Sequence, residues 1–162
     1  MTPDPVIRPA TVEDADGIAA VHVRSWQQTY AALVPPGALD DLDPAPRAAR
    51  WRQIVAGADT DVVVATVEGA VVGWAAAGAG RGESLPRDRE LEGLYVLAGQ
   101  HGTGIGQGLL EAAIGAAPAF LWVADGNPRA EAFYRRNGFS RDGRTMLHRL
   151  AGHPVTAVRM VR

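Results

Sequence analysis

The sequence predicts an α/β fold, in which a mixed sheet carries helices on both of its faces. Two patterns lead to this prediction. A β-branched run over residues 61–67 is followed by a glycine-containing turn and a second apolar run, which is typical of a hairpin. Later, strands expected over 91–97 and 120–124 flank an amphipathic helix over 104–116, which is typical of a strand–helix–strand crossing. A sheet that contains both kinds of connection is mixed.

Residue types that favour helix caps and turns mark where the expected helices and strands begin and end. Thr11 and the carboxylate of Asp14 form a capping box, so a helix should follow. Pro35-Pro36-Gly37 ends that region, Glu68-Gly69 is a tight turn, and Gly138 ends the last helix. The elements expected in chain order are a strand over 6–10, helices over 18–30 and 45–56, strands over 61–67, 71–75 and 91–97, a helix over 104–116, a strand over 120–124, a helix over 127–137 and a strand over 155–161.

The composition excludes several functional classes. The chain has 162 residues, which suits one domain over 1–162, and a formal net charge of −2, far from the basic balance of a nucleic-acid-binding protein. It has no cysteine, which excludes disulfides, thiolate metal sites and a cysteine nucleophile. It has no lysine, which excludes a Schiff base and a P-loop lysine.

No segment has the features of a targeting signal or a membrane anchor. Residues 1–5 lack the apolar core of a signal peptide, and the longest apolar runs are far shorter than the ~20 residues of a membrane helix. We therefore expect a cytoplasmic protein with no membrane partner. The four histidines lack the spacing of metal ligands, so no metal is expected; they are His22, His101, His148 and His153.

A glycine-rich turn, Gly102-Thr103-Gly104-Ile105-Gly106, joins the strand expected over 91–97 to the helix that follows. The first N–H groups of a helix have no partners within the helix, and the helix dipole places partial positive charge there. Glycines let a bulky anion approach the backbone because no Cβ intervenes. The turn therefore predicts a ligand that carries phosphate.

Two common phosphate loops do not fit this turn. A Walker loop needs Lys and then Ser or Thr, but Gly106 is followed by Gln107. A dinucleotide fingerprint needs glycines at i, i+2 and i+5, and no starting glycine in the turn meets that spacing. For the turn alone, a flexible loop without a ligand is the alternative.

A second motif follows one strand later, at residues 127–139: Asn-Pro-Arg-Ala-Glu-Ala-Phe-Tyr-Arg-Arg-Asn-Gly-Phe. Together, the two motifs resemble the GCN5-related N-acetyltransferase (GNAT) superfamily. The family's later helix reads Asn, two residues, Ala, two residues, Phe-Tyr, three residues, Gly-Phe, and the match is complete. In the family's loop, Gln or Arg precedes the glycines by three residues; here His101 stands at that position. Residues 21–30, with Leu33 and Pro35, resemble one bacterial branch of the superfamily.

The resemblance implies a fold, a cofactor and an activity. The fold is a mostly antiparallel sheet of six to seven strands, splayed between the fourth and fifth. The cofactor is acetyl-CoA, with coenzyme A as product, and the activity is transfer of an acetyl group to a primary amine of a small molecule or peptide. Direct attack in a ternary complex is expected, since no ping-pong nucleophile is apparent. Cofactor contacts are implied for Leu94, Tyr95, Val96, His101, Gly102, Thr103, Gly104, Ile105, Gly106, Asn127 and Tyr134.

Acetyl transfer to an amine needs a general base and is helped by a general acid. By resemblance, Tyr134 is the acid; the alternative is an aromatic packed in the core. Glu90 is the candidate base, acting directly or through water, and the alternative is a solvated charge at a strand end. Glu92 is a further candidate, because alternation places it on the same side as Glu90 unless a bulge intervenes.

The acceptor side is expected on the first long helix. His22, Trp26 and Tyr30 recur every four residues and share one helix face. Trp26 and Tyr30, with Glu92, are the candidate substrate-binding residues; a stripe of core aromatics is the alternative.

Two other functional classes compete with the enzyme. One is a non-catalytic domain that binds or senses acyl-CoA, and the other is a nucleotide-binding module. Tyr134 and a carboxylate at position 90 argue against the first, and the failed phosphate-loop patterns argue against the second. The resemblance also implies a homodimer as a common state of the superfamily.

Overall fold

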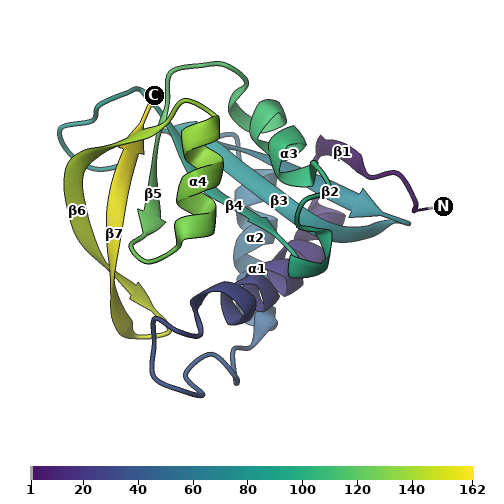
Figure 1. Cartoon of the computed structure of the whole chain (residues 1–162). Helices are drawn as coiled ribbons and strands as arrows, with labels where there is room; N and C mark the ends of the chain where they lie inside the picture. The colour runs from purple at the N-terminus through teal and green to yellow at the C-terminus, as the bar shows by residue number, and fades with distance from the viewer. Residues whose placement is uncertain (1) are drawn as a thin grey trace.

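The computed structural model describes residues 2–162, which form a seven-stranded sheet with helices on both faces (Figure 1). The strand order is β1-β2-β3-β4-β5-β7-β6. All neighbours pair antiparallel except β4 and β5, which are parallel. The strands are β1 (Val6–Pro9), β2 (Thr60–Val67), β3 (Ala70–Ala79), β4 (Arg89–Val96), β5 (Phe120–Ala124), β6 (Ser140–Leu150) and β7 (His153–Val161). The helices are α1 (Ala15–Tyr30), α2 (Pro44–Ala56), α3 (Ile105–Ile114) and α4 (Pro128–Arg136), with 3-10 turns η1 (Val12–Asp14) and η2 (Ala98–Gln100).

The two faces of the sheet are buried by different helices. On β2, Val62 and Val64 pack with α1 and α2, whereas Val63 and Ala65 belong to the cluster that contains α3 and Tyr134 of α4. Successive side chains of a strand point to opposite faces, so residues 62–65 of this strand are apolar on both faces. The predicted mixed sheet covered by helices on both faces is confirmed.

The parallel pair β4–β5 separates soon after it begins. Only Glu90 with Phe120 and Leu91 with Leu121 are in register. Beyond Leu91, β4 keeps its antiparallel partner β3 on one side and has no strand on the other. Figure 1 shows α4 lying over this opening between β4 and β5. The predicted splay between the fourth and fifth strands is confirmed.

Turn and capping residues predicted most helix and strand boundaries, but no local pattern predicted strand β6. Glu68 and Gly69 both have positive φ, 51° and 81°, as the hairpin turn requires. Asp14 accepts the backbone N–H of Thr11 at 2.8 Å, as expected of the capping box. Strand β6 was not predicted, because nearly all of its residues are exposed and its sequence lacks apolar alternation. Pairing with β7 holds it in place. Among residues 2–162, no helix combines the length and apolar character that crossing a membrane requires.

Candidate active site

Two cavities adjoin at the splay between β4 and β5. The first, of about 630 Å³, lies between β4, the glycine turn and α4, and we call it the glycine-turn cavity. The second, of about 520 Å³, lies between the end of α1, the β3–β4 loop and strands β5, β6 and β7, and we call it the aromatic cavity. Four residues border both and define the junction: Tyr30, Glu92, Tyr95 and Trp122. A group held at this junction is reachable from both cavities.

The glycine turn presents open space in front of a helix N-terminus. Gly104 is the N-cap of α3 with φ of 89°, and Gly102 has φ of 77°. A Cβ built on either residue would meet nothing within 4 Å. At these φ values a side chain would be strained. The free N–H groups of the first turn of α3 therefore face a space that suits an anion.

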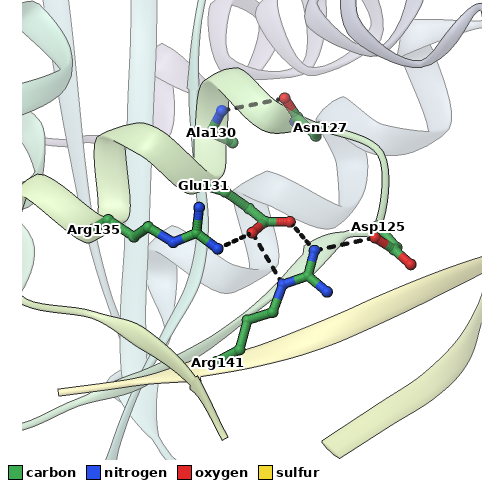
Figure 2. Close-up of polar contacts among 6 residues, drawn as sticks. All are labelled: Asp125, Asn127, Ala130, Glu131, Arg135 and Arg141. Carbon is green, nitrogen blue, oxygen red and sulfur yellow. Dashed lines mark hydrogen bonds and ion pairs between the residues drawn. The ribbon is translucent and has the colours of Figure 1, made fainter. Parts of the chain in front are cut away.

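Helix α4 is anchored from its polar side. Its N-cap, Asn127, accepts the N–H of Ala130 through Oδ1 at 3.2 Å. The carboxylate of Glu131, 5% exposed, accepts hydrogen bonds from Arg135 at 3.1 Å and from Nε of Arg141 at 3.0 Å. Figure 2 shows Arg141, on β6, also reaching Asp125 in the loop before α4. This network ties α4 to the outermost strand, so Tyr134 projects from a fixed helix.

Tyr134 lies in the glycine-turn cavity and is 7% exposed. Burial raises the pKa of its phenol above the usual value, and Tyr95 adds to the shift. A phenol with a raised pKa keeps its proton at pH 7. Tyr134 is therefore available as a neutral hydrogen-bond and proton donor.

The carboxylates of Glu90 and Glu92 share one guanidinium, that of Arg81 in the β3–β4 loop. Glu90 is 2% exposed and accepts from the backbone N–H of Arg81 at 3.0 Å and from its Nη2 at 2.6 Å. Glu92 lies farther away, with Oε1 at 3.8 Å from Arg81 Nε. Of the two carboxylates, only Glu92 borders both cavities.

A β-bulge sets the position of Glu92. Leu91 pairs with Ala77 and Gly93 with Ala76, so Glu92 is the extra residue on β4. Its side chain is 19% exposed. Burial raises the pKa of its carboxyl group, Arg81 opposes the shift, and the nearby charge of Glu90 adds to it. Bulges are often found beside active sites, where they redirect a side chain.

The α1 side of the junction is a cluster of aromatic rings. The hydroxyls of Tyr30 and Tyr95 lie 3.1 Å apart. Trp26 packs edge-on against Tyr30, with ring centroids 6.3 Å apart, and the guanidinium of Arg47 lies 4.3 Å from the Trp26 ring centroid. Burial raises the pKa of both tyrosines, so both hydroxyls stay protonated at neutral pH.

Comparison with known proteins assigns this arrangement to a family. Residues 23–139 match the model of the acetyltransferase (GNAT) family. The chain belongs to the acetyltransferase (GNAT) family. An uncharacterized N-acetyltransferase of Mycobacterium tuberculosis is 33% identical over 156 residues, which cover 92% of this chain and 97% of the relative. Family membership makes the chain an acyltransferase.

Solved GNAT structures share the fold. The PaiA N-acetyltransferase of Thermoplasma acidophilum, crystallised with coenzyme A, matches with a TM-score of 0.73 at 19% identity, over 96% of this chain and 98% of that one. The YncA structure from Salmonella typhimurium, which contains acetyl-CoA, matches with a TM-score of 0.68 at 22% identity, over 98% of this chain and 93% of that one.

The GNAT site brings most of the predicted residues together. The glycine-turn cavity is lined by Leu94, Tyr95, Val96, His101, Gly102, Gly104, Gly106, Asn127 and Tyr134, and the aromatic cavity by Trp26, Tyr30, Glu90 and Glu92. Two predicted cofactor residues lie outside both linings. The Thr103 hydroxyl donates to the carbonyl of Gln100 at 2.6 Å, and the Ile105 side chain is 1% exposed in the core. The Ile105 side chain is therefore turned away from a ligand, and the proton of the Thr103 hydroxyl is already used within the turn.

Sequence reasoning missed two residues of this GNAT site. Trp122 borders both cavities. In the sequence it is one apolar residue within an apolar strand, between Leu121 and Val123, and only its partial burial in the fold distinguishes it from them. Arg81 lies in a loop rich in Gly, Ser and Pro, where nothing local marks it. Only the fold brings it to Glu90.

The buried position of His22 leads us to expect that the stability of this GNAT chain depends on pH. Its Nδ1 accepts from the Trp51 indole at 3.3 Å, and its pKa is lowered to about 3 by burial and by the charge of Arg47. The native state therefore holds His22 neutral while the unfolded state binds a proton below its ordinary pKa of about 6.5. Stability is lost as the pH falls from about 6.5 toward 3.

We expect His22→Gln to reduce the acid sensitivity of folding. Between pH 6.5 and 4.5 the His22 contribution to the free energy of unfolding falls by about 2 kcal/mol, at about 1.4 kcal/mol per pH unit once the unfolded state is protonated. Urea denaturation of both proteins at the two pH values measures the difference. An equal loss in wild type and His22→Gln would show that His22 titrates normally in the native state.

Proposed function

We propose that this chain transfers an acetyl group from acetyl-CoA to a primary amine of a small molecule or peptide, by direct attack within a ternary complex. The observation that supports this most is the junction itself. An open helix N-terminus, an unpaired strand edge and the buried Tyr134 phenol border one cavity, and the carboxylate of Glu92 borders both this cavity and the second one. Two ligands held in these cavities meet at one place.

The residues present fit acetyl-CoA. The backbone N–H groups at Gly104 and Gly106 suit the pyrophosphate: a Cβ on Gly104 would meet nothing within 4 Å, and one on Gly106 would come no nearer than 3.7 Å to Phe133. Beyond Leu91, the edge of β4 that faces away from β3 has no strand to pair with and suits the amide groups of the pantetheine arm. The amide nitrogen of Asn127 is the donor left after its Oδ1 caps α4. When bound, acetyl-CoA supplies an activated acyl group as a thioester.

Tyr134 serves as the general acid. Its raised pKa keeps the phenol protonated at pH 7, and it lies in the cavity that would hold the thioester. A protonated phenol donates a hydrogen bond to the departing sulfur, and can share its proton with it as negative charge develops there.

Glu92, rather than Glu90, is the base that the geometry favours. The oxygens of Glu90 accept hydrogen bonds from the backbone N–H, Nε and Nη2 of Arg81, so its lone pairs are already engaged within the protein. Glu92 faces the junction, and burial raises the pKa of its carboxyl group toward the range useful at neutral pH. In this arrangement Glu90 holds Arg81, and Glu92 takes the proton of the amine directly or through water.

Calorimetric titration tests the cofactor. We expect acetyl-CoA to bind and ATP and NAD to bind far more weakly. Gly104→Val should weaken acetyl-CoA binding by about 10-fold or more, because a β-branched residue is strained at positive φ and fills the cradle. Gly99→Val is the matched control, since Gly99 lies in η2 without positive φ and outside the cavity lining. Undiminished binding by Gly104→Val would place the pyrophosphate elsewhere.

Removing the Tyr134 hydroxyl tests the acid. We expect Tyr134→Phe to lower kcat by roughly 10²–10⁴-fold, because the leaving thiolate loses its proton donor. Acetyl-CoA affinity, measured by calorimetry, should change little because the ring is retained. A full rate in the variant would exclude Tyr134 as the acid. Intact binding with no turnover of any amine by the wild type would instead favour a non-catalytic acyl-CoA-binding domain.

The pH dependence of kcat separates the two carboxylates. A base acts when deprotonated, so kcat should fall as the pH drops below the raised pKa of Glu92. Glu92→Gln should abolish this acidic limb, and Glu90→Gln should retain it. The opposite result would assign the base to Glu90, and a limb retained in both variants would assign it to a titrating group other than these two carboxylates.

A further inference from the structure

One face of helix α4 borders the glycine-turn cavity and carries two arginines. Four of the residues with which α4 lines this cavity follow the spacing i, i+3, i+4 and i+7; they are Arg129, Ala132, Phe133 and Arg136. This spacing places the two arginines on the same helix face, two turns apart and about 10 Å from each other along the axis. Glu131 and Arg135 lie outside the cavity lining and pair with each other instead (Figure 2).

Neither arginine of the cavity face has a carboxylate partner. Among residues 2–162, no Asp or Glu oxygen lies within 4.0 Å of a guanidinium nitrogen of Arg129 or Arg136. Arg135, in contrast, pairs with Glu131 at 3.1 Å. A guanidinium at the edge of a cavity, without an acidic partner in the protein, is available to an anionic ligand.

Arg136 lies at the end of this face that meets the glycine turn. Its guanidinium carbon is 6.0 Å from the ring centroid of Phe133, and a Cβ built on Gly106 would lie 3.7 Å from an edge atom of the same ring. The next residue, Asn137, accepts a hydrogen bond from Gln107, in the first turn of α3, at 2.9 Å. Arg136 therefore stands beside the helix N-terminus assigned above to the pyrophosphate.

The charges that line the cavity suit an anion at this end. Its lining contains one carboxylate, that of Glu92, which belongs to the junction. Glu92 precedes the end of β4 by four residues, and the glycine turn follows that end. The cation at the opposite side of the turn, Arg136, is thus separated from the only acidic group of the cavity lining. Guanidinium groups match phosphate oxygens with two parallel N–H donors.

Coenzyme A has a second anionic group besides the pyrophosphate. Its ribose carries a 3′-phosphate, which only the sugar ring separates from the pyrophosphate. A phosphate monoester has a charge of about −1.5 to −2 at pH 7. The N–H groups of the glycine turn are given to the pyrophosphate, so the 3′-phosphate needs another partner.

On the basis of the function proposed above, we propose that Arg136 binds the 3′-phosphate of coenzyme A and its acyl esters, and that Arg129 adds attraction at longer range. The protein thereby distinguishes acetyl-CoA from acetyl-dephospho-CoA. Arg136 determines which acyl donor is bound and does not touch the reacting atoms, which lie at the junction.

A matched pair of ligands tests this without any knowledge of the acceptor amine. Acetyl-CoA and acetyl-dephospho-CoA differ only in the 3′-phosphate. In calorimetric titration of the wild type at low ionic strength, Kd should be lower for acetyl-CoA by about 10-fold or more, because dephosphorylation removes a charge-assisted contact. Added NaCl should narrow the difference between the two ligands, since exposed charges are screened by salt.

Three arginines of α4 supply the matched variants. Arg136→Gln should bring the two Kd values to within about 3-fold of each other, mainly by weakening acetyl-CoA. Arg129→Gln should reduce the preference less, because its charge acts at longer range. Arg135→Gln removes the same charge from the same helix, but from the face outside the cavity lining, so the preference should not change.

The outcomes separate this proposal from the proposed function. Equal Kd values for the two ligands in the wild type, or a preference that Arg136→Gln leaves intact or Arg135→Gln lowers equally, would overturn the 3′-phosphate assignment. Acetyl-CoA binding and the acetyltransferase function would then still stand. If neither ligand binds the wild type, the cofactor assignment fails, and the proposed function and the role of Arg136 fail with it.

Discussion

The separation of β4 from β5 after Leu91 is the constraint on which the rest of the site depends. A strand in the middle of a sheet normally has partners on both edges, and unpaired backbone groups shielded from water are costly. Among residues 2–162, the stretch of β4 from Gly93 to Val96 has a strand partner only in β3. The fold therefore keeps a row of backbone donors and acceptors for a ligand. The glycine-turn cavity and the aromatic cavity are the two sides of this opening.

Different packing on the two sheet faces holds the opening in place. On one face, α3 packs into the core through Leu109 and Ala113, and its N-terminus points at the space before Gly104. Helix α4, whose Glu131 accepts a hydrogen bond from Arg141, covers the same face of the sheet. On the other face, the aromatic rings of α1 pack against β3 and β4, with His22 stacked on Tyr95 at a centroid distance of 5.7 Å. Large, closely packed rings resist collapse better than flexible aliphatic chains.

Local chemistry made much of this site predictable from the sequence. The glycine turn and the Asn127–Phe139 motif could be recognised because each is one continuous segment whose backbone and side chains carry the role. The splay between β4 and β5 was predicted only because the family resemblance implies it. Strand β6 was missed because tertiary pairing holds it in place without an apolar pattern. The importance of Arg81 and the bulge at Glu92 depend on how β3 and β4 pair, and a register shift leaves no mark in a single sequence.

The aromatic side of the junction also shows a local cost in stability. Within residues 2–162, the indole nitrogen of Trp74 is buried without a hydrogen-bond partner. Each unsatisfied donor costs about 1–3 kcal/mol, a substantial part of the 5–15 kcal/mol by which a domain is stable. Trp74 packs 5.3 Å from the ring of Tyr95, which borders both cavities. Local departures from optimal stability are expected at functional sites. Trp74 therefore supports a residue of both cavity walls, Tyr95, at the cost of an indole N–H without a partner.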